Sequence, residues 1–163
     1  MPSVNEYLKK ILEATQGSTP PSGSEEKESA IFERAYGAGN VNFSSPVFDI
    51  ANNEIYNDSA DIVKINNQKI TLKAGSKYKI QAFLNCTCVF SNGYVDYQLF
   101  SATNNAFTGV KGTVILTDNG GNSGSVVQPV GFIKDNGDID VEVHFNGGDE
   151  VTGYYLAIVI QKV

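Results

Sequence analysis

Few residues of this chain have the chemistry that catalysis requires. The only histidine is His144, and a serine or cysteine nucleophile needs a nearby base that is most often histidine. His144 alternates with acidic residues, so we expect it on a solvent-exposed strand face. The segment 121–125, Gly-Asn-Ser-Gly-Ser, approaches a nucleophile elbow but lacks its final glycine and follows a glycine-rich loop. Paired carboxylates could serve glycoside hydrolysis, yet there is no tryptophan for the usual sugar platform. The sequence therefore predicts a protein that is not an enzyme.

The two cysteines, Cys86 and Cys88, stand two residues apart in one apolar strand. Side chains at this spacing point to the same face of the strand, and two such cysteines cannot form an unstrained disulfide bond with each other. A metal site would need further ligands, and the lone His144 lies on a different strand. We therefore interpret both as small buried side chains in a reducing compartment.

A cluster of acids around Asn136 and Gly137 suggests calcium, and it consists of Asp135, Asp138 and Asp140. Their spacing does not match a calcium-binding loop, in which oxygen ligands recur at fixed alternate positions. We expect a tight turn with solvated acids here. The sequence predicts no metal and no cofactor.

Length and charge limit the remaining classes of function. The chain has 163 residues, enough for one substantial domain, and its net charge of −6 offers no basic patch for nucleic acid or an anionic membrane. We expect no signal peptide, because the first residues are patterned as a helix and include Glu6 and Glu13. No apolar run is long enough to span a bilayer.

The first 39 residues are predicted to form an anchor outside the main domain. Residues 3–14 suit an amphipathic helix with a capping box at Ser3 and Glu6. Its apolar stripe is formed by Val4, Tyr7, Leu8, Ile11 and Leu12. A Gly/Ser/Pro-rich linker follows at 17–24, and residues 25–36 indicate a second short helix. So short a first helix needs a surface to pack on, either its own domain or a groove on a partner, and we expect the partner.

From residue 41 the hydrophobic period changes from 3.6 to 2, which indicates strands. We expect them at residues 47–50, 61–65, 69–73, 77–90, 94–101, 106–117, 125–134, 138–145 and 151–162. Asn-Gly pairs, the strongest short hairpin signal, separate apolar runs at Asn92, Asn119, Asn136 and Asn146. The predicted fold of residues 40–163 is all-β, a jelly-roll sandwich.

The last predicted strand differs from the others because it does not alternate. Residues 153–163 read Gly-Tyr-Tyr-Leu-Ala-Ile-Val-Ile-Gln-Lys-Val, so both strand faces must be covered. Tyr154, Leu156, Ile158 and Ile160 share the face that we assign to the interior. The other face holds Tyr155, Ala157 and Val159, and Phe83 is expected beside them. We predict that these four residues meet further copies of the chain.

Several segments resemble known families. Residues 74–84, Ala-Gly-Ser-Lys-Tyr-Lys-Ile-Gln-Ala-Phe-Leu, resemble the start of the long central strand in the trimeric jelly roll of tumour necrosis factor and the complement globular heads. Residues 153–160 resemble that fold's final strand, which faces the threefold axis. Residues 97–109 are similar to a strand-turn-strand of bacteriophage fibres, and residues 5–14 to the leading helix of phage structural proteins. The collagen-like stalk of the complement relatives is absent.

This resemblance implies a homotrimeric virion protein, a head fibre or capsid decoration that is made in the host cytoplasm. The N-terminal helix would dock on a capsid or other virion protein, and the jelly roll would project outward. The alternative is a carbohydrate- or receptor-binding module on a tail or cell surface, since polar loops suit such contacts. Its candidate loop residues are Asp118, Asn119, Asn122, Asn146 and Asp149. A soluble cytokine-like ligand is a third, weaker interpretation.

Overall fold

The computed structural model describes residues 27–88, 93–116, 123–134 and 136–163. This part of the chain is built from β-strands. They are β1 (Ser29–Val41), β2 (Asn53–Asn57), β3 (Ile62–Lys64), β4 (Ile70–Leu72), β5 (Lys77–Cys88), β6 (Tyr94–Ser101), β7 (Ala106–Ile115), β8 (Ser123–Val127), β9 (Val130–Lys134), β10 (Ile139–Gly148) and β11 (Val151–Lys162). No helix of the described residues is long and apolar enough to cross a membrane.

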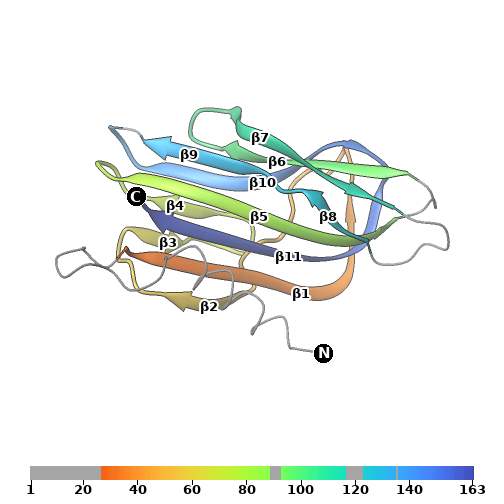
Figure 1. Cartoon of the computed structure of the whole chain (residues 1–163), viewed down its shortest axis with the longest axis horizontal. Helices are drawn as coiled ribbons and strands as arrows, with labels where there is room; N and C mark the ends of the chain where they lie inside the picture. Colours follow the sequence, from red (N-terminus) through yellow and green to blue (C-terminus); the bar gives the residue numbers. More distant parts are fainter. Residues whose placement is uncertain (1–26, 89–92, 117–122, 135) are drawn as a thin grey trace.

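The strands form two antiparallel layers (Figure 1). The first layer, which we call the β11 sheet, has the order β2-β1-β11-β5, with β9 also paired to β5. The second layer, the β10 sheet, has the order β7-β6-β10-β4-β3. Strand β8 pairs with both β5 and β7 and so joins the layers along one side. The all-β sandwich expected from the sequence is confirmed.

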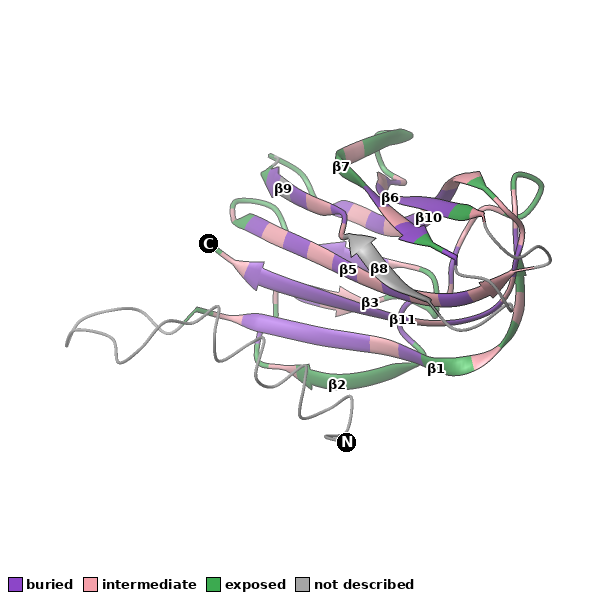
Figure 2. Ribbon diagram, turned by 45° about the vertical axis from the view of Figure 1, so that its right-hand side comes forward, coloured by how far each residue is buried: buried purple, intermediate pink, exposed green. Residues whose placement is uncertain are grey.

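The main core fills the space between the layers. Inward residues of β5 and β10 alternate with more exposed ones, as their period-2 patterns predict. In β5 the buried set is Tyr78, Ile80, Ala82, Leu84 and Cys86, and in β10 it includes Val141, Val143 and Phe145. These alternating bands are visible along β5 in Figure 2.

Strand β11 is the exception, because it is buried along nearly its whole length (Figure 2). It lies between β1 and β5, with Leu156 opposite both Arg34 and Leu84. Tyr154, Leu156, Ile158 and Ile160 belong to the main core, as predicted. Ala157 and Val159, on the opposite face, are buried as well. The sequence prediction that neither face of this strand is exposed to solvent is therefore confirmed.

The predicted helix over residues 25–36 is wrong, because Ser29–Val41 forms strand β1. This strand pairs with β11 from Ser29 opposite Gln161 to Val41 opposite Val151. The short apolar run at 30–32 suits a helical stripe and a strand equally, and the long-range pairing decides between them. The jelly-roll domain consequently begins about ten residues before the predicted boundary at residue 40. The helix predicted over residues 3–14 lies outside the described residues.

The hydrogen bonds of Arg34 explain why β1 can contain a buried charged residue. Its guanidinium donates to the backbone carbonyls of Tyr154 at 2.5 Å, Ala38 at 2.8 Å and Gly37 at 3.1 Å. The same group lies 3.8 Å from the centre of the Tyr154 ring, a cation–π contact. The pairing of β1 and β11 shifts register between Arg34 and Gly37, and Arg34 satisfies carbonyls at this irregularity.

Other boundaries differ from the sequence prediction for local reasons. Residues 47–50 form only an isolated bridge, Val47 to His144, although Phe48 and Ile50 are buried. The strand expected at 125–134 is divided into β8 and β9, because Pro129 has no amide hydrogen for a ladder. Strand β2 was not predicted.

The Asn-Gly pair at Asn146 does not form the expected hairpin turn. Strand β10 continues to Gly148, and its pairing with β6 shifts register between Phe145 and Gly147, which marks a β-bulge. Gly148 has a φ of 92°, and a Cβ there would lie 2.0 Å from the carbonyl oxygen of Tyr94. The bulge therefore moves the turn to residues 149–150. The pair at Asn136 connects β9 to β10, which lie in different layers, so it is not a hairpin either.

Candidate functional site

A second apolar cluster lies on the face of the β11 sheet that points away from the main core. It contains Ile31 from β1 and Ala157 and Val159 from β11, with partly buried Phe83 from β5 and Tyr155 packed against it. We call these residues the outer cluster. Ile31 lies opposite Val159, and Ala157 lies opposite Phe83, so the three adjacent strands bring them together.

The sequence prediction that Phe83, Tyr155, Ala157 and Val159 share one face is confirmed by this grouping. Their role as a trimer interface remains a prediction. Sequence reasoning missed Ile31, because residues 25–36 were interpreted as a helix. The signal that could have found it is the alternation of Ile31 with Ala30 and Phe32, both of which are buried in the main core.

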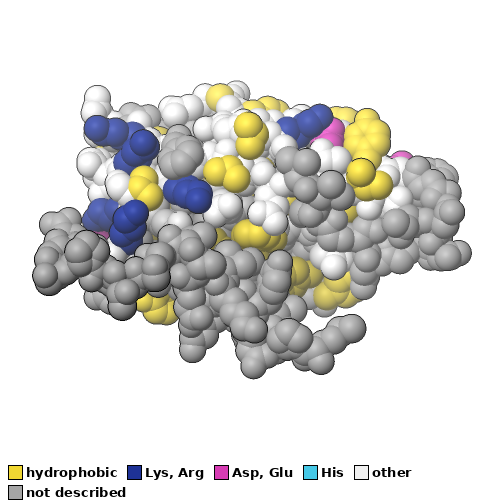
Figure 3. All heavy atoms as spheres, viewed as in Figure 1, with side chains coloured by type: hydrophobic (Ala, Val, Ile, Leu, Met, Phe, Trp, Pro, Cys, Tyr) yellow, Lys and Arg dark blue, Asp and Glu magenta, His cyan; other side chains and the backbone are white. Residues whose placement is uncertain are grey.

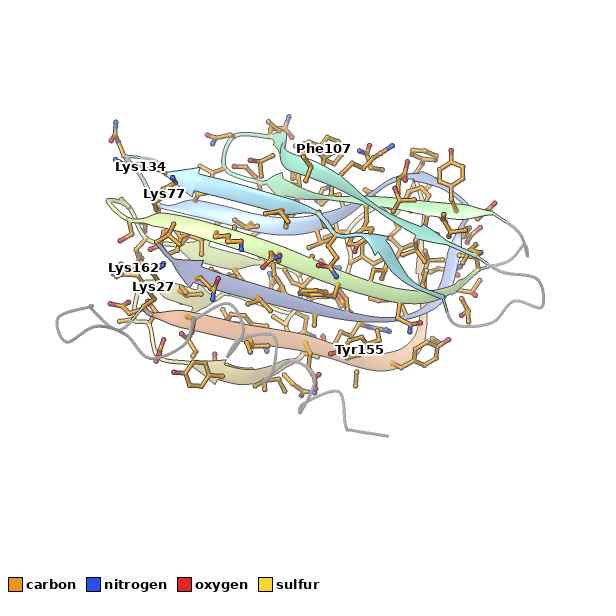
Figure 4. The ribbon with its side chains drawn as sticks, viewed as in Figure 1. Lys27, Lys77, Phe107, Lys134, Tyr155 and Lys162 are labelled. Atoms are coloured by element: carbon orange, nitrogen blue, oxygen red, sulfur yellow. The ribbon has the colours of Figure 1, made fainter. Side chains whose placement is uncertain are left out.

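Tyr155 is the polar member of the outer cluster. Its hydroxyl donates to Oε2 of Glu33 at 3.1 Å. Burial, together with the negative charge of Glu33, raises the pKa of Tyr155 well above the ordinary value of 10.0. The phenol therefore stays neutral at physiological pH, and the cluster combines an aromatic surface with one fixed hydrogen bond. The side chain of Tyr155 is labelled in Figure 4.

His144 is not the solvated histidine that the sequence suggested. Its ring stacks on Phe100 with 4.0 Å between ring centres and an angle of 18° between planes. Its Nε2 lies 2.7 Å from Oε2 of Glu142, and only 12% of the side chain is exposed. The expectation failed because β6 supplies an aromatic neighbour from across the ladder, which single-strand alternation does not reveal.

The acids near Asn136 are engaged with different partners. Asp138 lies 2.8 Å from the Lys73 ammonium and also accepts from the Ala74 amide at 3.0 Å; these bonds lower the pKa of Asp138. Asp140 accepts a hydrogen bond from the Thr71 hydroxyl at 2.6 Å. Asp135 lies outside the described residues. In the part of the chain that the structure describes, no group of three or more His, Cys, Asp or Glu side chains could hold a metal ion.

The two cysteines are both free. Cys86 is buried in the main core, and Cys88 is partly buried against it, so they share a face as predicted. The Cys86 thiol donates a hydrogen bond to the Cys88 sulfur, which lowers the pKa of Cys88 and, together with burial, raises that of Cys86. The more reactive thiol is therefore the more exposed one.

The predicted binding loops and anchor lie only partly within the described residues. Asn146 donates to Oε1 of Gln98 at 2.8 Å, and Asp149 accepts from the backbone amide of Tyr94 at 3.1 Å. These two side chains hold β10 and its turn against β6. The other predicted loop residues, Asp118, Asn119 and Asn122, lie outside the described residues, as do the anchor residues Val4, Tyr7, Leu8, Ile11 and Leu12.

No family model and no curated protein sequence matches this chain. Among solved structures, murine APRIL superimposes with a TM-score of 0.51 at 8% identity, over 85% of this chain and 100% of that one. Pika GITRL gives 0.42 at 16% identity, over 82% and 95% of the two chains. The tripod from the baseplate of bacteriophage Tuc2009 gives 0.33 at 13% identity, over 99% and 93%.

Only the first of these similarities exceeds a TM-score of 0.5, and at 8% identity it shows the fold alone. The class defined by the fold is therefore a two-layer jelly roll of the tumour-necrosis-factor type, as the sequence resemblance implies. In this fold the outer cluster lies on the layer that contains the closing strand.

Proposed function

We propose that this chain forms a homotrimer through the outer cluster and that the trimer is a structural protein of a virion surface, a head fibre or capsid decoration. The observation that supports association most directly is that Phe83 and Tyr155 of the outer cluster are only partly buried within one chain. Core-type residues lie on the outward face, although a strand needs only one apolar face to close a sandwich. Partly exposed aromatic residues beside apolar ones are typical of subunit contacts.

The sizes of the side chains suit a symmetric contact. Ala157 and Val159 are small and are already buried within one chain, so they form the base of the patch. Phe83 and Tyr155 are only partly buried within one subunit and provide aromatic surface for the neighbouring copy. We assign this surface to copies of the same chain, because the resemblance of residues 153–160 is to a strand that faces a threefold axis.

The virion role rests on the resemblance of two segments to phage proteins. Residues 97–109 include the end of β6 and the start of β7, so the similarity to fibre jelly rolls falls on an element of this fold. The segment 5–14 would bind a capsid or other virion protein through its apolar stripe and leave the jelly roll outside. A glycan- or receptor-binding module is the second candidate, and a pocket described below favours it.

Light scattering on the full chain tests the trimer. We expect wild-type protein to have three times the mass of one chain. Val159→Glu would bring an unpaired carboxylate into an apolar contact and should give monomers or unfolded protein. The matched control is Gln68→Glu, which adds the same charge in an exposed turn of the other layer and should leave the trimer intact. Glu142, an apparent surface position in the sequence, is a poor control because it contacts His144 and Lys69.

A second variant separates loss of association from loss of folding. Phe83 is only partly buried, so Phe83→Glu should dissociate the trimer while the β-sheet circular dichroism stays native. Wild-type protein that is monomeric, or a Val159→Glu protein that remains trimeric, would rule out this interface.

A further inference from the structure

Lysine side chains gather at one end of the β11 sheet, although the chain has a net charge of −6. In Figure 3 the dark blue groups concentrate at the left end of the face, and Figure 4 labels most of them there. The residues of this lysine end are Lys27, Lys77, Lys79, Lys134 and Lys162. Lys27 precedes β1, Lys77 and Lys79 lie at the beginning of β5, and Lys134 and Lys162 lie at the ends of β9 and β11. The antiparallel strand order therefore brings them to the same end of the sheet.

The strand register places like charges next to each other. Lys77 lies directly opposite Lys134 in the pairing of β5 with β9, and Lys79 follows two residues later on the same face. Like charges in such cross-strand positions repel each other and destabilise a sheet. Lys162 is neutralised by Glu28 and Asp61. Lys79 and Lys134, in contrast, form no ion pair with another described residue.

A pocket of about 250 Å³ opens beside Lys134. It lies between the β6–β7 turn and the strands β9 and β10. Ile133 and Ile139 are apolar, nearly buried lining residues, and Phe107 lines the pocket with 46% of its surface exposed. Its other lining residues are Ser101, Asn104, Ala106, Thr108 and Lys134.

The size and lining of this pocket suit one sugar ring. Pockets for drug-sized ligands usually measure roughly 300–1,000 Å³, and this one is smaller. Apolar C–H groups of a sugar pack on aromatic rings, and its hydroxyls bond with serine, threonine and asparagine side chains. Phe107 is held for such a contact by edge-to-face packing on Phe100, with 5.3 Å between ring centres.

We propose that the pocket binds one ring of an anionic glycan, with an acidic group of that glycan at Lys134 and a further acidic group at Lys79. This arrangement would neutralise Lys134 and Lys79 and fill the pocket with the same ligand. A nucleic acid is less suited, because the overall charge of the protein is negative and the basic surface is confined to one end. The site needs no second subunit, so it is independent of the proposed trimer.

Calorimetric titration of the full chain tests this proposal with four probes. They are alginate, which bears carboxylates, dextran sulfate, which bears sulfates, neutral dextran, and a single-stranded DNA. We expect at least one acidic glycan to bind about tenfold more tightly than dextran or DNA. The affinity should fall with added salt, because ions screen exposed charges. Which acidic glycan binds identifies the anionic group.

Matched variants locate the site. Lys134→Gln and Phe107→Leu should each weaken glycan binding by about tenfold. The control Lys64→Gln removes one positive charge from β3 and should leave the affinity within about twofold. Melting temperatures check that all variants fold, and light scattering reports the oligomer separately. The proposal is overturned if neither acidic glycan binds, if DNA binds equally well and Phe107→Leu has no effect, or if Lys64→Gln weakens binding as much as Lys134→Gln.

Discussion

The hydroxyl of Tyr155 donates to Oε2 of Glu33 at 3.1 Å, and this bond ties β11 to β1 beside the outer cluster. A carboxylate next to an apolar patch is thereby held in one position by a neutral phenol. The contact joins two residues that are 122 positions apart in the chain. It therefore reports both the pairing of β1 with β11 and the environment of the proposed interface.

Alkaline titration should detect this environment. The pKa of Tyr155 is raised from 10.0 by burial and by Glu33, so its protonated form is the one that the fold stabilises. The resulting stabilisation is present below pH 10 and is lost as the pH rises through the folded pKa. In absorbance titrations at 295 nm, Tyr155→Phe should lack one of the late-ionising tyrosines of the wild type. Unchanged late ionisation in the variant would contradict the buried contact.

Arg34 should be the most sensitive polar residue of the core. Arg34→Ala would leave the carbonyls of Gly37, Ala38 and Tyr154 without their donor, and we expect the free energy of unfolding to fall by about 2–4 kcal/mol. Arg34→Lys should recover only part of this, because an ammonium lacks the planar fork of a guanidinium. Urea denaturation measures both, with Lys64→Ala as a control expected to change stability by less than about 0.5 kcal/mol. Equal stability of Arg34→Lys and wild type would show that the fork is unnecessary.

The cysteines should differ in reactivity. Cys88 is partly exposed and its pKa is lowered by the hydrogen bond from Cys86, whose own pKa is raised. Iodoacetamide at neutral pH should therefore alkylate Cys88 before Cys86, and peptide mass spectrometry can follow both sites. Replacing both by Ala or Val should lower stability by about 1–2 kcal/mol without loss of the oligomer. Faster alkylation of Cys86, or dissociation of the wild type by a reductant, would contradict this assignment.

Deletion of residues 1–14 tests the proposed anchor. The described sheets lie wholly beyond this segment, so we expect the truncated protein to keep its melting temperature and its oligomeric state. Incorporation into virions should be abolished, because the apolar stripe of Val4, Tyr7, Leu8, Ile11 and Leu12 would be missing. Quantitative mass spectrometry of purified particles from the encoding phage measures incorporation. Normal incorporation rules out the anchor, and a large fall in melting temperature would mean that the segment packs on its own domain.

Local sequence determined the elements whose pattern is unambiguous. Strict alternation in β5 and β10 identified their inward faces, and the continuous apolar run of β11 predicted burial on both sides. These patterns can be interpreted without knowing the neighbouring strands, because the backbone of a strand fixes the period with which its side chains alternate. The grouping of Phe83 with Tyr155, Ala157 and Val159 followed from the same parity.

Only the tertiary structure decided the features that depend on which strands become neighbours. The run from Ala30 to Phe32 is compatible with helix or strand, and pairing with β11 makes it β1 and adds Ile31 to the outer cluster. His144 gains its stacked partner from β6, and Lys134 meets Lys77 only because β9 pairs with β5. Strand order and register join residues that are distant in sequence, and single-segment periodicity contains no information about either.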